Sequence, residues 1–274
     1  MQNNCEKISS LQNARVKQVV ALSQKSSERR KRGLFVVEGL RELLHCLRHG
    51  YQAESLYICD DVAHDDAEMD ELMGLVGEGA VFHVTAAVYG KMAYREGTEG
   101  VLGVIHARSA SLKDLSLSAV PLVVVAEGVE KPGNLGAILR SADAANADAV
   151  IFCDALTDLY NPNVIRASIG AVFTVPCAVA TSAECIQFLQ SKGIQILTAQ
   201  LQDSEVYYDT DMRCATAIVM GTESTGLTDQ WRDAAQRHIR IPMLGSLDSL
   251  NVSVSTAILL FEAVRQRMGE KGGA

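Results

Sequence analysis

The sequence lacks the patterns that would mark a membrane, secreted or disulfide-bonded protein. No apolar run approaches the roughly 18 residues that a membrane-spanning helix requires, and the N-terminal stretch MQNNCEKISS does not have the composition of a signal peptide. The seven cysteines form no C-x-x-C pair, and an odd number argues against a framework of disulfides. We therefore expect a soluble, cytoplasmic protein with reduced thiols.

Motifs that define several enzyme classes are also missing. The chain has no G-x-S-x-G, H-E-x-x-H or G-x-x-x-x-G-K-[ST], so hydrolase, zinc-protease and P-loop interpretations have no residues to rest on. A dinucleotide-binding unit with Asp154 on a ribose is an alternative, but it requires G-x-G-x-x-G. Gly128, Gly133 and Gly136 have the wrong spacing in too long a loop. This leaves hydride transfer a weak alternative.

Positive charge is scarce overall but concentrated near the N-terminus. A net charge of −8 and a pI near 5.3 argue against a non-specific nucleic-acid binder. Residues 1–50 nevertheless hold ten Lys or Arg against four acids, whereas residues 60–78 hold eight acids and no base. The run Arg29–Arg32, before Gly33, is expected to be a basic connector that attracts phosphate. A solvated basic turn without a ligand is the alternative.

Local patterns before residue 107 predict a small α/β domain. Residues 8–25 resemble an amphipathic helix capped by Ser9 or Ser10. His45 and His49 share a helical face, but no third ligand accompanies them, so we expect no metal site. The small, polar residues 107–118 are expected to be a linker. The other predicted elements are strands at 34–37, 55–59, 81–84 and 100–106, and helices at 40–49, 66–76 and 86–92.

From Pro121 onward the pattern becomes an alternation of strands and helices. Strands rich in Val, Ile and Ala, without polar alternation, are buried on both faces. They predict a mainly parallel α/β sheet with helices on both sides. The predicted strands are 122–126, 149–153, 173–175, 195–198, 217–220 and 237–241, and the helices are 135–145, 164–168, 183–191, 228–235 and a long final one.

Three segments of this second region carry small and polar residues beside apolar ones: Asn134–Ser141 (NLGAILRS), Met220–Leu227 (MGTESTGL) and residues 246–251 (SLDSLN), which lead into the final helix. Hydroxyl and amide side chains with free backbone N–H groups at a helix start suit a polar ligand. An ordinary Ser or Asn cap is the alternative for the third segment alone.

In this order and at these separations, the three segments resemble the signature motifs of the SpoU (TrmH-like) class of SPOUT methyltransferases. Those enzymes methylate RNA ribose 2′-hydroxyls with S-adenosylmethionine. The resemblance is strong over residues 121–268, and residues before 105 are more weakly similar to the L30e-like domain that often precedes the catalytic one. Ser224 stands where the family more often has glycine.

The resemblance implies roles for individual residues. Arginine is effectively always protonated, so we expect Arg140 to grip phosphate and polarise the hydroxyl rather than act as a plain base. The implied catalytic residues are Arg140, Asn134, Glu223, Ser249 and Asn251; the cofactor contacts are Thr198, Gly221, Ile241, Met243 and Leu250; and the RNA contacts are Arg30, Lys31, Arg32, Glu38, Arg41 and Arg95.

The resemblance also implies an organisation. Residues 1–106 would form the L30e-like RNA-binding domain, 107–118 a linker, and 119–274 a methyltransferase domain with a trefoil knot. The knotted domain would be an obligate homodimer in which Arg140 acts in the partner's site. No metal is required, because the sulfonium is already an activated donor. We expect 23S ribosomal RNA as substrate; the alternatives are tRNA, or a non-catalytic RNA-binding or ribosome-assembly protein.

Overall fold

The computed structural model describes residues 7–64, 67–94, 99–222 and 225–268. The chain forms two compact units: residues up to Arg108 together with Asp158–Thr174, and Ser109–Thr157 together with the chain from Val175 onward. The domain bounds 1–106 and 119–274 stay a prediction. The two units are not continuous in sequence, since the segment Asp158–Thr174 packs within the first unit.

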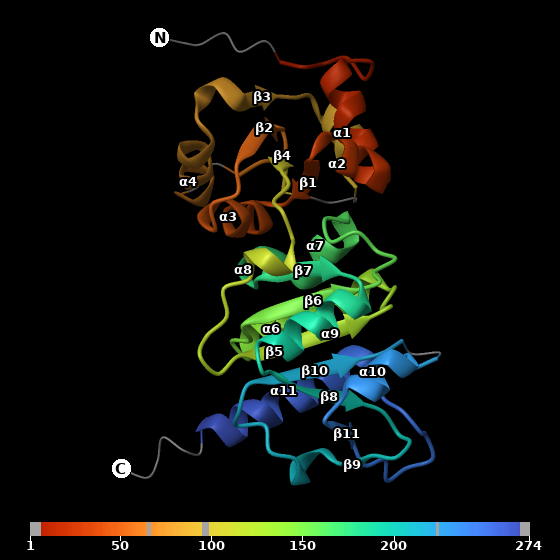
Figure 1. Cartoon of the computed structure of the whole chain (residues 1–274). Helices are drawn as coiled ribbons and strands as arrows, with labels where there is room; N and C mark the ends of the chain where they lie inside the picture. The colour runs from red at the N-terminus through yellow and green to blue at the C-terminus, as the bar shows by residue number, and fades with distance from the viewer. Residues whose placement is uncertain (1–6, 65–66, 95–98, 223–224, 269–274) are drawn as a thin grey trace. The chain divides into compact units, whose positions relative to one another are not determined.

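The first unit contains a four-stranded sheet in the order β1-β4-β2-β3 (Figure 1). Strand β4 is antiparallel to β1 and β2, and β2 is parallel to β3. Helix α1 packs on this sheet, with Val16, Val19 and Leu22 in its core. The strands are β1 (Leu34–Glu38), β2 (Ala53–Ile58), β3 (Val81–His83) and β4 (Val101–His106), and the helices are α1 (Ala14–Gln24), α2 (Ser26–Arg32), α3 (Leu40–Arg48), α4 (Ala67–Val76), α5 (Ala86–Met92), α7 (Pro162–Ser168) and α8 (Ala171–Thr174).

Two predictions for this unit are wrong. The first helix begins at Ala14 rather than near residue 8, because the Asn13 side chain caps it by accepting from Arg15 N at 2.8 Å. The basic run is not a connector but the last turn of α2. Gly33 ends that helix in the left-handed conformation at φ 63°. Cations in a last turn interact favourably with the helix dipole, which explains why this polar segment is helical.

The second unit is built on a seven-stranded sheet in the order β7-β6-β5-β10-β8-β11-β9. Every neighbouring pair is parallel, which confirms the predicted fold class. The strands are β5 (Leu122–Glu127), β6 (Ala149–Cys153), β7 (Cys177–Ala180), β8 (Gln195–Ala199), β9 (Glu205–Val206), β10 (Thr216–Met220) and β11 (Arg237–Arg240), and the helices are α6 (Pro132–Ala144), α9 (Ser182–Ser191), α10 (Asp229–Ala234) and α11 (Val252–Met268).

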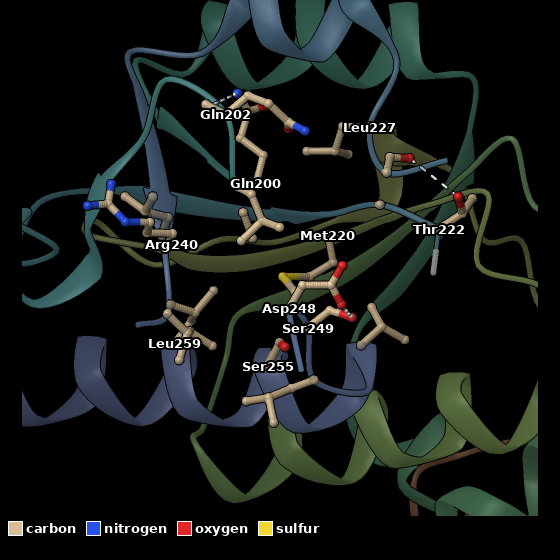
Figure 2. A pocket seen from close by; sticks show the side chains of 18 of the residues that line it. Gln200, Gln202, Met220, Thr222, Leu227, Arg240, Asp248, Ser249, Ser255 and Leu259 are labelled. Carbon is tan, nitrogen blue, oxygen red and sulfur yellow. Dashed lines mark hydrogen bonds between the residues drawn. The ribbon is translucent and has the colours of Figure 1, made fainter. Parts of the chain in front are cut away.

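Helices cover both faces of the sheet. Helices α9 and α10 lie on one face, where Trp231 and Leu189 pack on Val125 and Val219. Helices α6 and α11 pack against each other below the strands in Figure 2. Ala217 and Val219 of β10 face Trp231, so Ile218 between them points to the opposite face of the sheet, where it is also fully buried. Within the described residues, no helix is both long and apolar enough to cross a membrane.

The strand predicted at residues 173–175 is wrong. Residues Ala171–Thr174 form the short helix α8, and the strand begins only at Cys177. Phe173 lies 5.9 Å from the ring of Phe35 and 5.2 Å from that of Tyr51, so aromatic packing within the first unit fixes the segment as a helix. Packing therefore overrides the local strand preference of Val, Phe and Thr.

A buried carboxylate joins three elements of the second unit. Glu127, at the end of β5, is 4% exposed and accepts hydrogen bonds from the N–H and hydroxyl of Thr228, at 2.9 and 2.6 Å. The Ser182 hydroxyl lies within hydrogen-bond distance of both Glu127 and Asp154 and accepts from the Trp231 indole at 2.9 Å. These contacts fix the starts of α9 and α10 against the sheet.

Candidate active site

A cavity of about 560 Å³ lies at the carboxyl ends of three parallel strands, β8, β10 and β11. This edge is where open parallel sheets commonly bind ligands. Apolar side chains form much of the wall, including Met220, Leu227 and Ile239, and the volume falls in the range of small-molecule sites. Figure 2 shows Ser255 and Leu259 reaching it from α11, below the strands.

Glycine at position 221 is required by the way the next loop closes. Thr222 and Gly226 exchange backbone hydrogen bonds of 3.2 and 3.1 Å, which brings Gly226 back onto Gly221. A Cβ atom at Gly221 would lie 2.5 Å from the Gly226 carbonyl carbon. The missing side chain thus allows the two backbone segments of this loop to approach each other closely. Glu223 and Ser224, in the same loop, lie outside the described residues.

The third polar segment contributes residues 248–251 to the cavity lining and leads directly into α11. The Asn251 carboxamide oxygen accepts from the N–H and hydroxyl of Ser253, at 3.1 and 2.6 Å, and so caps the helix. Its Nδ2 donates to Oδ1 of Asn134 at 3.1 Å. Asp248 and Ser249 lie beside Met220 in Figure 2. The first and third segments therefore meet at the cavity.

Four of the five predicted cofactor contacts line this cavity, namely Gly221, Ile241, Met243 and Leu250. The fifth, Thr198, is fully buried in β8 and its hydroxyl lies 2.6 Å from His238 Nδ1. The lining begins one residue later, at Ala199.

The predicted catalytic residues divide into two groups. Ser249 and Asn251 line the cavity, and Asn134 adjoins it through its bond to Asn251. Arg140 is exposed on α6 and is not among the residues that line the cavity of its own chain. No described residue bonds to its guanidinium.

Several cavity residues were not predicted. Gln200 and Gln202 follow β8, Arg240 ends β11, and Asp248 lies within the third segment. The rule that ligands bind beyond the carboxyl ends of parallel strands would have indicated the residues after β8 and β11. Asp248 was available in the SLDSLN stretch, two residues before the predicted contact Leu250.

The predicted RNA contacts of the first unit are distributed over α2, β1 and α3. Arg30, Lys31, Arg32 and Arg41 are exposed, as phosphate contacts must be. Their neighbour Arg29 is only 5% exposed and pairs with Asp158 at 2.6 Å. The basic run therefore contains one buried cation and three exposed ones, of which Arg32 pairs with Glu28 at 3.1 Å. Glu38 accepts from Tyr94 N at 2.9 Å, and Arg95 lies outside the described residues.

Thiols and potential metal ligands are dispersed. The described residues contain no cluster of His, Cys, Asp and Glu that could hold a metal ion. All six described cysteines are free, and Cys214 is the exposed one among them. A hydrogen bond with Cys185, followed by burial, raises the pKa of the Cys153 thiol, and burial raises that of Cys177 to about 12. Neither favours a nucleophilic thiolate.

Two protein-family models match this chain. The model of the SpoU rRNA Methylase family matches residues 121–261, and that of the MRM3-like substrate binding domain matches residues 13–103. The first match contains the three polar segments and the cavity, and the second contains the basic run and the four-stranded sheet for most of its length.

Individual proteins agree with these matches. The chain is 39% identical over 149 residues to a 23S rRNA (guanosine-2′-O-)-methyltransferase from Xanthomonas axonopodis, a match covering 54% of this chain and 60% of that relative. It is 29% identical to the 23S rRNA (uridine(2479)-2′-O)-methyltransferase of Streptomyces viridochromogenes, over 93% of this chain and 91% of the relative. The crystal structure of an AdoMet-bound rRNA methyltransferase from Sinorhizobium meliloti superposes with a TM-score of 0.86 at 29% identity, covering 95% and 97%.

Proposed function

Because this chain belongs to the SpoU rRNA methylase family, we propose that it transfers a methyl group from S-adenosylmethionine to a ribose 2′-hydroxyl of 23S ribosomal RNA. The observation that carries the proposal is the cavity beyond β8, β10 and β11, joined to α6 by the bond between Asn251 and Asn134. The relatives matched over 54% and over 93% of this chain are both 23S rRNA 2′-O-methyltransferases by name.

The cavity fits this cofactor in size and chemistry. Its apolar walls suit an adenine ring, and polar lining residues such as Gln200 and Ser249 offer hydrogen-bonding groups to the ribose and amino-acid portions. Asp248 is an acid within the lining and would favour a cationic ligand. We assign Gly221, Ile241, Met243 and Leu250 to cofactor binding.

Methyl transfer to a ribose requires help with one proton. When bound, the cofactor supplies an activated methyl group, whose bond to sulfur breaks as the bond to the 2′-oxygen forms. Arg140 would bind the phosphate of the target nucleotide and hold its hydroxyl in line. Since arginine stays protonated, the hydroxyl proton would pass to phosphate or water. Asn134, Ser249 and Asn251 would orient the ribose.

We also propose that the protein acts as a homodimer, with Arg140 serving the partner's cavity. Arg140 is exposed and apart from the cavity of its own chain. Helix α11 carries a row of exposed apolar side chains, with Val254 and Phe261 each 48% and Met268 68% exposed. Such a face favours burial against a second copy. Sedimentation of a monomer at micromolar concentration would contradict this assembly.

Mixed dimers test the exchange of Arg140 between subunits. Arg140→Ala and Leu250→Arg chains are each expected to be inactive, the second because its cavity is filled. If Arg140 acts in the partner, an equimolar mixture that exchanges subunits regains about a quarter of wild-type activity, because half the dimers hold one complete site. If Arg140 acts within its own chain, the mixture stays inactive.

The proposal further includes the trefoil knot of the family, formed by the chain around the third polar segment, and a cytoplasmic location beside the ribosome. A knot would persist in a chain whose ends are joined. Such a cyclised chain is expected to scatter X-rays in denaturant as a more compact coil than an unknotted circle of equal length. An identical radius would contradict the knot.

Activity is tested with unmodified 23S ribosomal RNA transcript and isotopically labelled S-adenosylmethionine. Methylation removes the 2′-hydroxyl nucleophile, so the modified position is identified as a gap in an alkaline hydrolysis ladder. The expected result is one gap for wild type and none for Arg140→Lys, which keeps the charge but loses the planar fork. Label entering only tRNA would redirect the substrate assignment. Cofactor binding without any methylation would favour a non-catalytic RNA-binding role.

A further inference from the structure

An exposed tyrosine in the first unit is held in one orientation. Tyr94 follows α5, and 47% of its surface is exposed. Its backbone N–H donates to Oε2 of Glu38 at 2.9 Å, and its hydroxyl accepts from Nδ2 of Asn163 at 3.0 Å. Both ends of this residue are therefore fixed, whereas an exposed aromatic side chain without such partners exchanges between rotamers.

The groups that hold Tyr94 are themselves fixed. Asn163 lies in the first turn of α7, and its N–H donates to the capping side chain of Asn161 at 2.9 Å. The segment before α7 is anchored on β1, because Tyr160 stacks on Phe35 with ring centroids 4.2 Å apart and planes 10° from parallel. The ring thus sits on a rigid part of the first unit.

A cation lines the same hollow as the tyrosine. Arg166, one turn after Asn163 on α7, is exposed and lines the same small hollow as Tyr94 and Glu38. No described residue pairs with its guanidinium. The hollow measures about 20 Å³, too little for a nucleobase, so the exposed face of the Tyr94 ring is the surface available to a ligand.

We propose that Tyr94 is a stacking platform for one unpaired base of the RNA substrate, and that Arg166 binds the adjacent phosphate. The proposal rests on the proposed function and adds two contacts to it. Single-stranded RNA is recognised mainly by bases stacked on aromatic side chains, with arginine on the backbone. A ring already fixed by Glu38 and Asn163 loses little conformational freedom when a base stacks on it.

Three variants separate stacking from a structural role. Tyr94→Phe keeps the ring and loses only the bond to Asn163, whereas Tyr94→Leu removes the ring. Tyr208→Leu is the matched control, because Tyr208 is 54% exposed and lies in the second unit away from the cavity lining. Dissociation constants are measured by filter binding of unmodified 23S ribosomal RNA transcript, together with KM for RNA, kcat and calorimetric affinity for S-adenosylmethionine.

We expect Tyr94→Leu to raise the Kd and KM for RNA about 10-fold, with kcat and cofactor affinity unchanged. Tyr94→Phe and Tyr208→Leu should stay within about 2-fold of wild type. Equal RNA affinity for Tyr94→Leu and Tyr208→Leu would overturn the proposal, as would equal losses for Tyr94→Phe and Tyr94→Leu. Arg166→Gln is expected to reduce the slope of log Kd against log salt by about 1.

Photochemical crosslinking of the wild-type protein covers the case in which Tyr94→Leu does not fold. An RNA adduct on Tyr94, located by mass spectrometry, supports the proposal, and adducts confined to other residues overturn it. Failure of the proposed function has a different signature, because wild-type protein would then methylate no RNA. RNA that binds without methylation still reports whether Tyr94 contributes.

Discussion

Asn251 donates a hydrogen bond to Oδ1 of Asn134 at 3.1 Å, although 117 positions separate them in the chain. The bond joins the first turn of α6 to the residue before α11. The same Asn251 side chain caps α11 through its oxygen. The amide oxygen of Asn251 thus caps the helix while its nitrogen binds Asn134. Substitution can remove the nitrogen donor and keep the oxygen acceptor.

Asn251→Ala removes both the cap and the link to Asn134. We expect the free energy of unfolding to fall by about 1 kcal/mol, the usual cost of a lost N-cap. Asn251→Asp keeps an oxygen for Ser253 and should stay within a few tenths of a kcal/mol of wild type. Both variants lose the donor to Asn134, so both should lose methyl transfer. Denaturant titration and single-turnover assays measure these effects; full activity in Asn251→Asp would show that the link is dispensable.

Substitution of the neighbouring cations Arg29 and Arg30 should affect different properties, the first the stability of the fold and the second the binding of RNA. Arg29 pairs with Asp158 and donates to the Leu22 carbonyl at 2.6 Å, so Arg29→Ala leaves a largely buried carboxylate, 14% exposed, without its partner. We expect a loss of about 3 to 5 kcal/mol of stability. Exposed Arg30 should tolerate alanine, but RNA binding should weaken and its salt slope fall by about 1. Equal stability of the two variants would contradict this division.

The buried carboxylate of Glu127 should contribute strongly to stability. Glu127→Gln replaces one acceptor oxygen by a donor in a site where Thr228 and Ser182 already donate. One unsatisfied buried group should cost about 2 kcal/mol, or about 5 °C in melting temperature for a unit of this size. Glu130→Gln, at an exposed position in the following loop, is the control. A melting temperature equal to that of the control would contradict the structural role.

An exposed ion pair predicts a small acid-sensitive contribution. Hydrogen bonds from Arg213 lower the pKa of Asp211 to about 2, from an ordinary value of 3.8. Because the folded-state value is the lower one, the contribution is complete above pH 3.8 and disappears as pH falls toward 2. The stability difference between wild type and Asp211→Asn should therefore shrink over that interval. Arg213→Gln should reduce the pH dependence of this difference without abolishing it, because the backbone N–H of residue 213 still donates to Asp211 Oδ1 at 2.9 Å. A difference that grows on acidification would contradict the prediction.

The sequence was informative wherever local pattern and tertiary packing agree. The apolar run Ala149–Cys153 forms β6 with the predicted bounds, because a central parallel strand is buried on both faces. The helix Ala86–Met92 also has its predicted bounds, with Thr85 as its cap. Gly221, Ile241, Met243 and Leu250 were inferred from resemblance, and they line one cavity.

Long-range packing limited what the sequence could reveal. Asp158–Thr174 lies between two strands of the second unit in chain order, yet its contacts belong to the first unit. Nothing in its local pattern indicates the stack of Tyr160 on Phe35. Similarly, four consecutive cations gave no sign that Arg29 alone is buried, because burial depends on Asp158, 129 positions away. Tyr94 was passed over because its partners come from distant segments.

The position of α11 in the chain has a consequence for biosynthesis. Residues 248–252 complete the cavity, and they follow all seven strands of the sheet. A nascent chain that has formed every strand still lacks one wall of the cavity until α11 packs on α6 and Asn251 reaches Asn134. Small-molecule binding is therefore acquired in one late step of synthesis, and a stalled intermediate would be a folded sheet that cannot yet bind its ligand.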